Sequence, residues 1–296
     1  MKTIVSYAWK TLVCAVAYMG GSMLGAALAT ALGVSLPSMP GTKPAQLALF
    51  AFLASLTLGA SMGPLAAGLR SRYLARVAAL ALFAYVCLGV NTALETTIFT
   101  TVGGGAGIVV LFLPATFACA AAAAALFRPA TARYTTAAPW SRFAAQFGAW
   151  SWAWRLAAAI VAFPVVYLAF GMMVGPFVVD AYRNQAHGLT LPGWGQIIPT
   201  QFLRSTLFLV ASVPVIAFWG GSRRRLALSL GLATFTFVGL FGMLQAFWLP
   251  TAMRLVHGAE IAADSFVYAT LLVWLLARPV PGREPGPVAA ALRTAA

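Results

Sequence analysis

The chain has 296 residues, of which 61% are apolar and only 8% are charged, and its formal net charge is +14. A soluble domain carries about a quarter charged residues, so the composition excludes an ordinary soluble protein and indicates a polytopic membrane protein. The positive charge does not point to nucleic acid, because the arginines stand mostly between apolar runs, as they do in membrane proteins. We therefore expect an all-α chain whose partners are membrane lipids and a small solute or lipid. An oligomer is compatible with this composition.

Eight apolar segments are long enough to cross a membrane, since a spanning helix needs about 20 apolar residues. In chain order they cover residues 11–33, 46–68, 74–96, 105–127, 155–177, 202–220, 226–248 and 255–277. The first run is too long for the apolar part of a typical signal peptide, which favours a membrane helix there. Cleavage after the Ala-Leu-Ala sequence at 27–29 is the alternative. Eight crossings would place both termini on the same side.

Basic residues predict which side that is. Fifteen lysines and arginines fall in the set formed by the N-terminus, the loops after the second, fourth and sixth segments, and the C-terminal tail. The opposite set holds only four, which are Lys43, Arg183, Arg204 and Arg254. The positive-inside rule then predicts an integral protein of the cell (inner) membrane with both termini in the cytoplasm.

Short matches suggest that the chain contains two related halves. "KPAQ" opens the second segment and "IPTQ" the sixth, while "RSRYLARVAALALF" opens the third and "RRRLALSLGLATF" the seventh. "ALFRPA" ends the fourth and "LLARPV" the eighth, and the first and fifth each contain a GxxxG pair, Gly21–Gly25 and Gly171–Gly175. The offsets are about 145 to 155 residues. An even number of helices per unit predicts two parallel four-helix repeats, residues 1–128 and 155–278, in which Glu95 corresponds closely to Gln245.

Between the repeats lies a predicted cytoplasmic linker, residues 129–154. Its aromatic residues recur at helical spacing, at Trp140, Phe143, Phe147, Trp150 and Trp154. This pattern predicts one amphipathic helix on the membrane surface, with a plain linker as the alternative. The Pro- and Gly-rich tail, residues 279–296, is predicted to be a disordered cytoplasmic segment. The longest outer loop is expected over residues 178–199.

Polar residues form a narrow stripe on the last segment. At 100° per residue, Arg254, His257, Glu260, Asp264 and Tyr268 fall on one face of a helix. The chain has only five carboxylates and two histidines, so this concentration is notable. Such a face must turn away from lipid. Counting from the cytoplasmic end puts His257 and Glu260 near the outer interface and Asp264 about one turn deeper.

The third segment carries a second polar face at a similar depth, where Asn91 and Glu95 lie one turn apart. Two polar faces at one depth predict an outward-open polar cavity between the third and eighth helices. Its expected lining is Asn91, Glu95, Gln245, Arg254, His257, Glu260 and Asp264, with Tyr268 deeper. The structural alternative is that Arg254 pairs with Glu260 and that His257 bonds a backbone carbonyl near the headgroups.

Metal chemistry has weak support in the sequence. His257 and Glu260 stand at i and i+3 and could reach one ion, with Glu95 or His187 completing the shell. One histidine per site is thin for zinc, so the sequence predicts neither a metal nor a cofactor. The three cysteines, Cys14, Cys87 and Cys119, lie inside apolar segments and are expected to be buried thiols.

Three classes of function are compatible with these features, and no motif of a known family accompanies them. The favoured one is a transporter in which Glu260 or Asp264 carries a proton or binds a cationic group. The second is a membrane-embedded enzyme, with or without a metal, acting on a lipid or lipid-linked substrate at the outer leaflet. The third is a scaffold or accessory subunit in which the stripe only packs.

Overall fold

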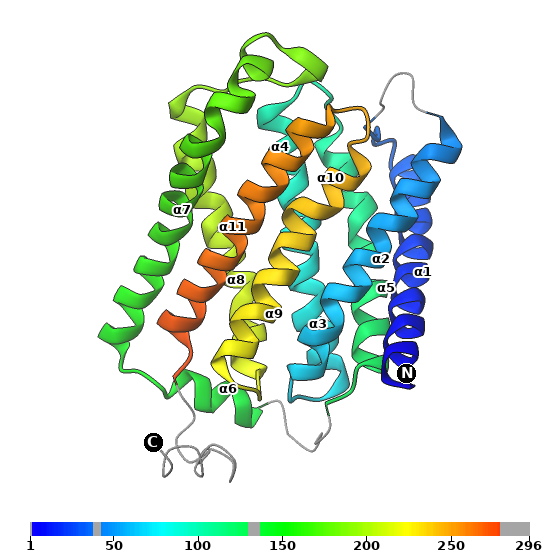
Figure 1. Ribbon diagram of the computed structural model, residues 1–296. Coiled ribbons are helices and arrows are strands. Elements are labelled where there is room, and N and C mark those ends of the chain that lie inside the picture. Colours follow the sequence, from blue (N-terminus) through cyan, green and yellow to red (C-terminus); the bar gives the residue numbers. More distant parts are fainter. Residues whose placement is uncertain (1, 38–42, 130–136, 279–296) are drawn as a thin grey trace, which may run out of the picture.

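The computed structural model describes residues 2–37, 43–129 and 137–278, and in these residues the chain forms a helical bundle (Figure 1). Eight of its helical spans are long and apolar enough to cross a membrane, which confirms the predicted number of spans. They are α1 (Lys2–Ala31), α2 (Pro44–Gly68), α3 (Tyr73–Ala84) continued by η1 (Tyr85–Val90) and α4 (Asn91–Phe99), α5 (Gly105–Leu126), α7 (Ala149–Arg183), α8 (Trp194–Phe218), α9 (Arg223–Phe235) continued by η3 (Thr236–Leu240) and α10 (Phe241–Gln245), and α11 (Thr251–Leu276). The protein is therefore an integral membrane protein.

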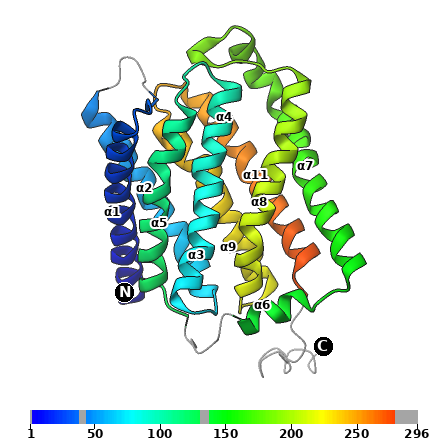
Figure 2. The same ribbon diagram turned by 180° about the vertical axis from the view of Figure 1, so that it is seen from behind.

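The spans form two flanks around a shared centre. α1, α2 and α5 lie together on one flank, and α7, α8 and α11 on the other, as both views show (Figures 1 and 2). α2 contacts α9 and α3 contacts α8 between them. α1 begins and α11 ends at the same end of the bundle, as expected for eight crossings.

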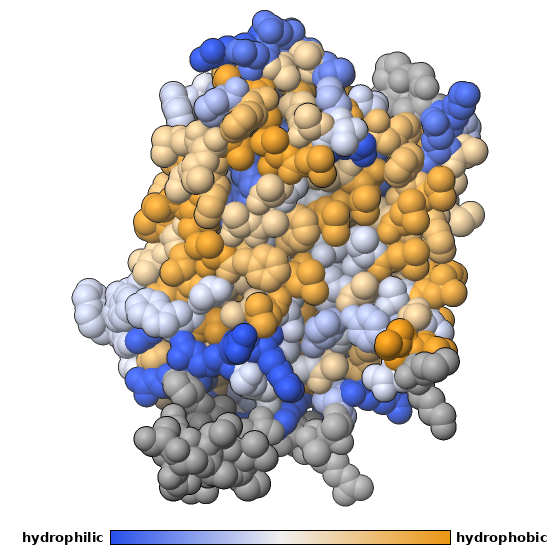
Figure 3. All heavy atoms as spheres, viewed as in Figure 1, coloured by the Kyte–Doolittle hydropathy of each residue, from blue (hydrophilic) through white to orange (hydrophobic). Residues whose placement is uncertain are grey.

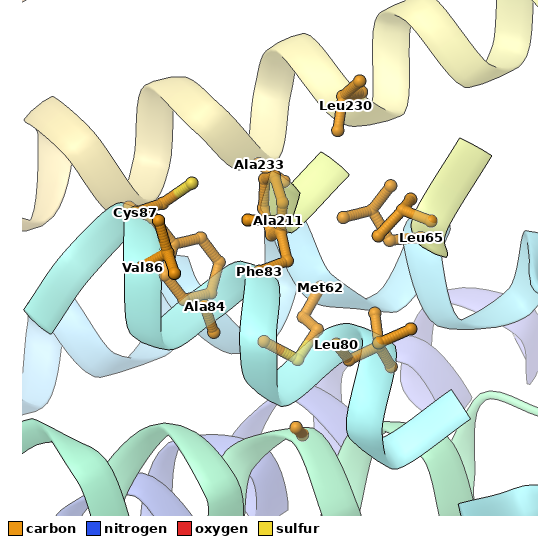
Figure 4. Packing of buried hydrophobic residues seen from close by; sticks show 14 of the residues in the cluster. Met62, Leu65, Leu80, Phe83, Ala84, Val86, Cys87, Ala211, Leu230 and Ala233 are labelled. Carbon is orange, nitrogen blue, oxygen red and sulfur yellow. The ribbon is translucent and has the colours of Figure 1, made fainter. Parts of the chain in front are cut away.

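Buried apolar side chains fill the centre. Met62 of α2, Phe83 of α3, Ala211 of α8 and Leu230 of α9 belong to one core (Figure 4). Phe83 meets Phe237 edge to face, with ring centroids 6.1 Å apart. The three cysteines are buried thiols, as expected.

The loops at one end of this core bind each other reciprocally. The Arg70 amide donates to the Phe218 carbonyl at 2.8 Å, and the Gly220 amide donates to the Gly68 carbonyl at 3.0 Å. The donor of the first bond stands 150 residues before the donor of the second, and the two acceptors are separated by the same 150 residues. Exchanging residues 150 apart therefore converts one hydrogen bond into the other, which is the pattern of a two-fold contact.

The third and seventh spans each contain a π-helical segment. η1 ends at Val90 and η3 ends at Leu240, again 150 residues apart. A π-helical turn widens the helix and shifts the faces of the residues that follow it. In the third span these residues are Asn91 and Glu95 of α4.

The aromatic linker differs from its prediction. α6 (Ala137–Ala144) ends before Phe147, and α7 begins at Ala149 after Gly148 in an extended conformation. Trp150 and Trp154 therefore belong to α7, so the prediction of one amphipathic helix is wrong. The physical reason is that Phe147 turns inward, where it is 8% exposed and packs against Trp152 with ring centroids 5.1 Å apart.

The outer loop is also shorter than predicted. α7 continues to Arg183 and α8 begins at Trp194, so residues 184–193 connect them, including the short helix η2 (Ala186–Gly188). This loop is fixed to the end of α4, because the Thr190 amide donates to the Phe99 carbonyl at 2.8 Å. The early start of α8 places Arg204 in the interior of a span, whereas the predicted segment 202–220 put it at one end.

Candidate functional site

Arg204 of α8 is the centre of a buried polar cluster. Its side chain is 3% exposed, and its Nη2 donates to Glu95 Oε1 at 2.6 Å. Its Nε donates to Asn91 Oδ1 at 2.8 Å, and its Nη1 donates to Gln201 Oε1 at 2.9 Å. The guanidinium therefore joins α8 to α4, which carries the polar face predicted for the third span.

The chemistry of Arg204 fixes how the two amides around it are turned. A guanidinium has donors only, so Asn91 and Gln201 must present their oxygens to it. Their amino groups, Asn91 Nδ2 and Gln201 Nε2, are then directed away from the arginine. Both are buried and donate to no described residue. A buried donor without an acceptor costs about 1–3 kcal/mol, so these two amino groups favour the binding of a molecule that accepts hydrogen bonds.

Aromatic rings enclose the remaining faces of the guanidinium. Its carbon lies 5.3 Å from the ring centroid of Phe163, 5.5 Å from that of Tyr167 and 5.7 Å from that of Phe208. Cations are attracted to aromatic faces, most strongly where water is excluded. α7 and α8 thus hold the charge in place on the sides that Glu95 does not reach.

On α11, His257 links a carboxylate to a phenol. Its Nδ1 lies 2.9 Å from Glu260 Oε2, and its Nε2 lies 3.3 Å from the hydroxyl of Tyr182 of α7. Because an ionised carboxylate only accepts, the proton of a neutral imidazole belongs on Nδ1, and the Tyr182 hydroxyl donates to Nε2. The result is a relay of three side chains from α7 to the buried Glu260.

Asp264 lies one turn beyond Glu260 and is 5% exposed. Its Oδ1 is buried and accepts no hydrogen bond from a described residue. It is close enough to Glu260 and Arg204 to interact electrostatically with both. Asp264 therefore lies within electrostatic range of both the relay on α11 and the arginine cluster on α8.

Asp264 and Arg204 lie near the middle of their helices. α11 has 26 residues starting at Thr251, so Asp264 lies at its middle. α8 has 25 residues starting at Trp194, and Arg204 lies two residues from its middle. Both helices begin before the predicted segments, which were 255–277 and 202–220.

The seam between α7 and α11 is open beside Glu260. A Cβ placed on Gly171 would meet only Glu260 Oε1, at 3.4 Å, and one placed on Gly175 would meet nothing within 4 Å. Hydrophilic residues are visible in a recess between the upper parts of these two helices (Figure 3). The GxxxG glycines of α1 are instead closed against α5, where a Cβ on Gly25 would lie 2.2 Å from the Leu111 carbonyl oxygen.

Five of the predicted site residues thus belong to two neighbouring groups. They are Asn91 and Glu95 around Arg204, and His257, Glu260 and Asp264 on α11. Tyr268 is buried deeper on the same face, and its hydroxyl donates to the Ser205 carbonyl at 3.4 Å.

The other candidates lie apart from these groups. Arg254 Nη1 donates to the Met243 carbonyl at 3.4 Å and makes no ion pair with Glu260, so the alternative pairing of these two residues is wrong. Gln245, at the end of α10, forms no hydrogen bond with a described residue. His187 is exposed in the outer loop.

Sequence reasoning missed Gln201, Arg204, Tyr167 and Tyr182. Arg204 was counted with the basic residues at one end of the sixth segment, although it stands within the apolar sequence "QFLRSTLFLV". A charged residue inside such a run is itself a signal of a functional or buried pair. Gln201 stands three residues earlier, on the same face of that helix.

No described residues form a group of three or more histidine, cysteine, aspartate or glutamate side chains that would hold a metal ion. His257 and Glu260, the central pair of the candidate metal set, are instead bonded to each other. No family model, curated protein or solved structure matches this chain.

Proposed function

We propose that this protein is a transporter that binds a proton or a cationic group at Glu260 and Asp264, between the third and eighth spans. The observation that carries the proposal is Asp264, a carboxylate at the middle of a span, 5% exposed, with one oxygen that accepts no hydrogen bond in the described chain. Burying an unpaired carboxylate costs several kcal/mol. Such residues within spans mark ion and substrate pathways.

The charges around the site favour a cation. Arg204 is balanced by Glu95, and His257 is the hydrogen-bonded neighbour of Glu260. Asp264 has no such partner, so the region beside it carries excess negative charge. The amino groups of Asn91 and Gln201 would accommodate a hydrogen-bond acceptor on the same solute.

A duplicated architecture supports the transporter over the other classes. Reciprocal bonds between Gly68–Arg70 and Phe218–Gly220, π-helical segments that end 150 residues apart, and helix ends at Leu126 and Leu276 are what two parallel repeats would produce. Transporters commonly bind substrate between repeats and rock one against the other. With both termini in the cytoplasm of a cell-membrane protein, the recess beside Glu260 opens outward.

Purified protein reconstituted in liposomes that contain a pH-sensitive dye tests this function. Gradients of sodium, potassium and small organic amines are applied in turn, and internal pH is followed. A pH change that Asp264→Asn removes is the expected result. No change with any of these cations, and identical traces for the wild type and Asp264→Asn, would contradict it.

A second candidate is an enzyme acting from the outer side on a lipid or lipid-linked substrate. The specific observation that favours it is the Tyr182–His257–Glu260 relay, because an imidazole oriented by a carboxylate is the usual arrangement of a general base. Incubation with membrane lipid extract, followed by mass spectrometry of the products, tests it. A product that requires His257, together with metal analysis of the purified protein, would establish the enzyme and its metal dependence.

A further inference from the structure

A hollow lies at the end of α11 that is farther from Glu260, and it takes no part in the proposed function. It lies where α7 and α9 begin and α11 ends, and its volume is about 220 Å³. Hydrophilic residues gather around this end of the bundle on the face shown in Figure 3. The lining residues are Phe147, Trp154, Arg155, Arg223, Trp274, Ala277 and Arg278.

Two of the arginines are held by the end of α11. Arg155 Nη1 donates to the Leu275 carbonyl at 2.6 Å, and Arg223 Nη2 donates to the Val273 and Trp274 carbonyls at 3.2 and 3.1 Å. The Trp274 and Leu275 carbonyls lie in the last turn of the helix, where carbonyls lack partners within the helix, so these bonds satisfy them. The Val273 carbonyl also accepts from the Ala277 amide at 3.0 Å. Each arginine bond also fixes the position of a guanidinium at the hollow. Arg155 Nη2 and Arg223 Nη1 remain without acceptors among the described residues.

The third arginine is held by an aromatic ring. The guanidinium carbon of Arg278 lies 4.4 Å from the ring centroid of Phe147, and that of Arg155 lies 4.1 Å from the same centroid. The Arg278 guanidinium donates to no described residue. Two cations thus share one buried ring, and a third stands on the same wall of the hollow.

No described carboxylate balances these charges. The described acids are Glu95, Asp180, Glu260 and Asp264, and none of them lines the hollow. Three cations placed together repel one another unless an anion joins them. The arrangement therefore calls for an anionic ligand rather than a neutral one.

We propose that this hollow binds the phosphate group of an anionic membrane phospholipid. Guanidinium groups bind phosphate oxygens through paired, charge-assisted hydrogen bonds. The hollow lies at the ends of spans, where headgroups are found, and basic pockets between helices on the cytoplasmic side hold such headgroups. Trp154 and Trp274 are 42% and 63% exposed on its rim, as expected for side chains at the membrane interface.

Binding of dioleoylphosphatidylglycerol to the purified full-length protein tests the proposal, with native mass spectrometry as the readout. Arg278→Gln removes a cation that makes no hydrogen bond within the described protein, so folding should be unaffected. Loss of one charged hydrogen bond predicts binding weakened by about tenfold or more. Arg224→Gln is the matched control, since it removes the same charge from an exposed neighbour outside the hollow and should leave binding unchanged.

Further arms distinguish the source of the anion. Dioleoylphosphatidylcholine, whose headgroup is zwitterionic, should bind more weakly, and inorganic phosphate should not displace phosphatidylglycerol at equal concentration. Equal loss of binding in Arg224→Gln and Arg278→Gln would overturn the proposal in favour of diffuse attraction. Displacement by inorganic phosphate would overturn the lipid as the occupant.

Discussion

The guanidinium of Arg204 and the carboxylate of Glu95 are 2.6 Å apart, and they differ in exposure, at 3% for the arginine side chain and 34% for the glutamate. Removing Glu95 should therefore affect the stability of the protein differently from removing Arg204. Without Glu95, a charge buried among aromatic rings loses its counter-charge. Without Arg204, a half-exposed carboxylate can still be hydrated.

Replacing Glu95 by leucine should accordingly lower the free energy of unfolding by about 3–5 kcal/mol. Adding Arg204→Met should recover part of this loss, because the uncompensated charge is then gone. Equilibrium unfolding in mixed detergent micelles measures both variants. Asp180→Leu is the control, since its pair with Arg183 is exposed and should contribute little. A double variant as unstable as the sum of the two single ones would contradict this account.

The two GxxxG pairs should respond oppositely to added methyl groups. Gly25→Ala would place a Cβ 2.2 Å from the Leu111 carbonyl oxygen, which forces α1 away from α5 and should destabilise the protein by about 1–3 kcal/mol. Gly175→Ala meets nothing within 4 Å and should be neutral or raise stability by up to about 1 kcal/mol through its helix propensity. Thermal unfolding in detergent distinguishes them. Equal destabilisation would mean that α7 is packed as closely as α1.

The number of spans and the polar stripe of α11 could be predicted because each depends on local sequence. The number of spans follows from the apolar runs, and the common face of Glu260 and Asp264 follows from the helical period. Which residues meet between helices does not follow from either. Arg204 binds Asn91 across 113 positions of sequence, and nothing near either residue signals that contact.

The π-helical segments are a second reason why the sequence did not predict which side chains face one another. η1 lies immediately before Asn91, and one extra residue in a turn changes the direction of every side chain after it relative to those before. Helical spacing correctly groups Asn91 with Glu95, because both follow η1. It does not predict the direction of these two side chains relative to Tyr73, because η1 lies between them. The break at Gly148 had a similar effect on the aromatic stripe, whose regular spacing continues across two helices.

Orientation in the membrane can be tested by cysteine labelling in intact cells. Gly148 and Gly193 both precede helices in extended backbone, and a Cβ at either meets nothing within 4 Å. The native cysteines are buried, which leaves a low background. A membrane-impermeant maleimide should label Gly193→Cys in intact cells, and Gly148→Cys only after permeabilisation. The reverse pattern would place the termini outside and turn the recess beside Glu260 toward the cytoplasm.

Asp264 offers the sharpest test, because stability and function should change in opposite directions. Asp264→Asn removes a buried carboxylate that lacks a hydrogen bond at Oδ1, so the melting temperature should rise, by about 2–4 °C for each kcal/mol gained. The same change should abolish cation-driven proton movement in liposomes. His257→Ala should lower the rate without abolishing it, since His257 is the partly buried neighbour of Glu260 and the proposed transport mechanism places the moving charge on the carboxylates. If membrane lipid extract yields a product, and both variants lose it, the enzyme is favoured instead. A melting temperature that falls in Asp264→Asn, with flux intact, would assign the carboxylate a packing role. Neutralising a group lowers the stability only where that group stabilises the folded protein.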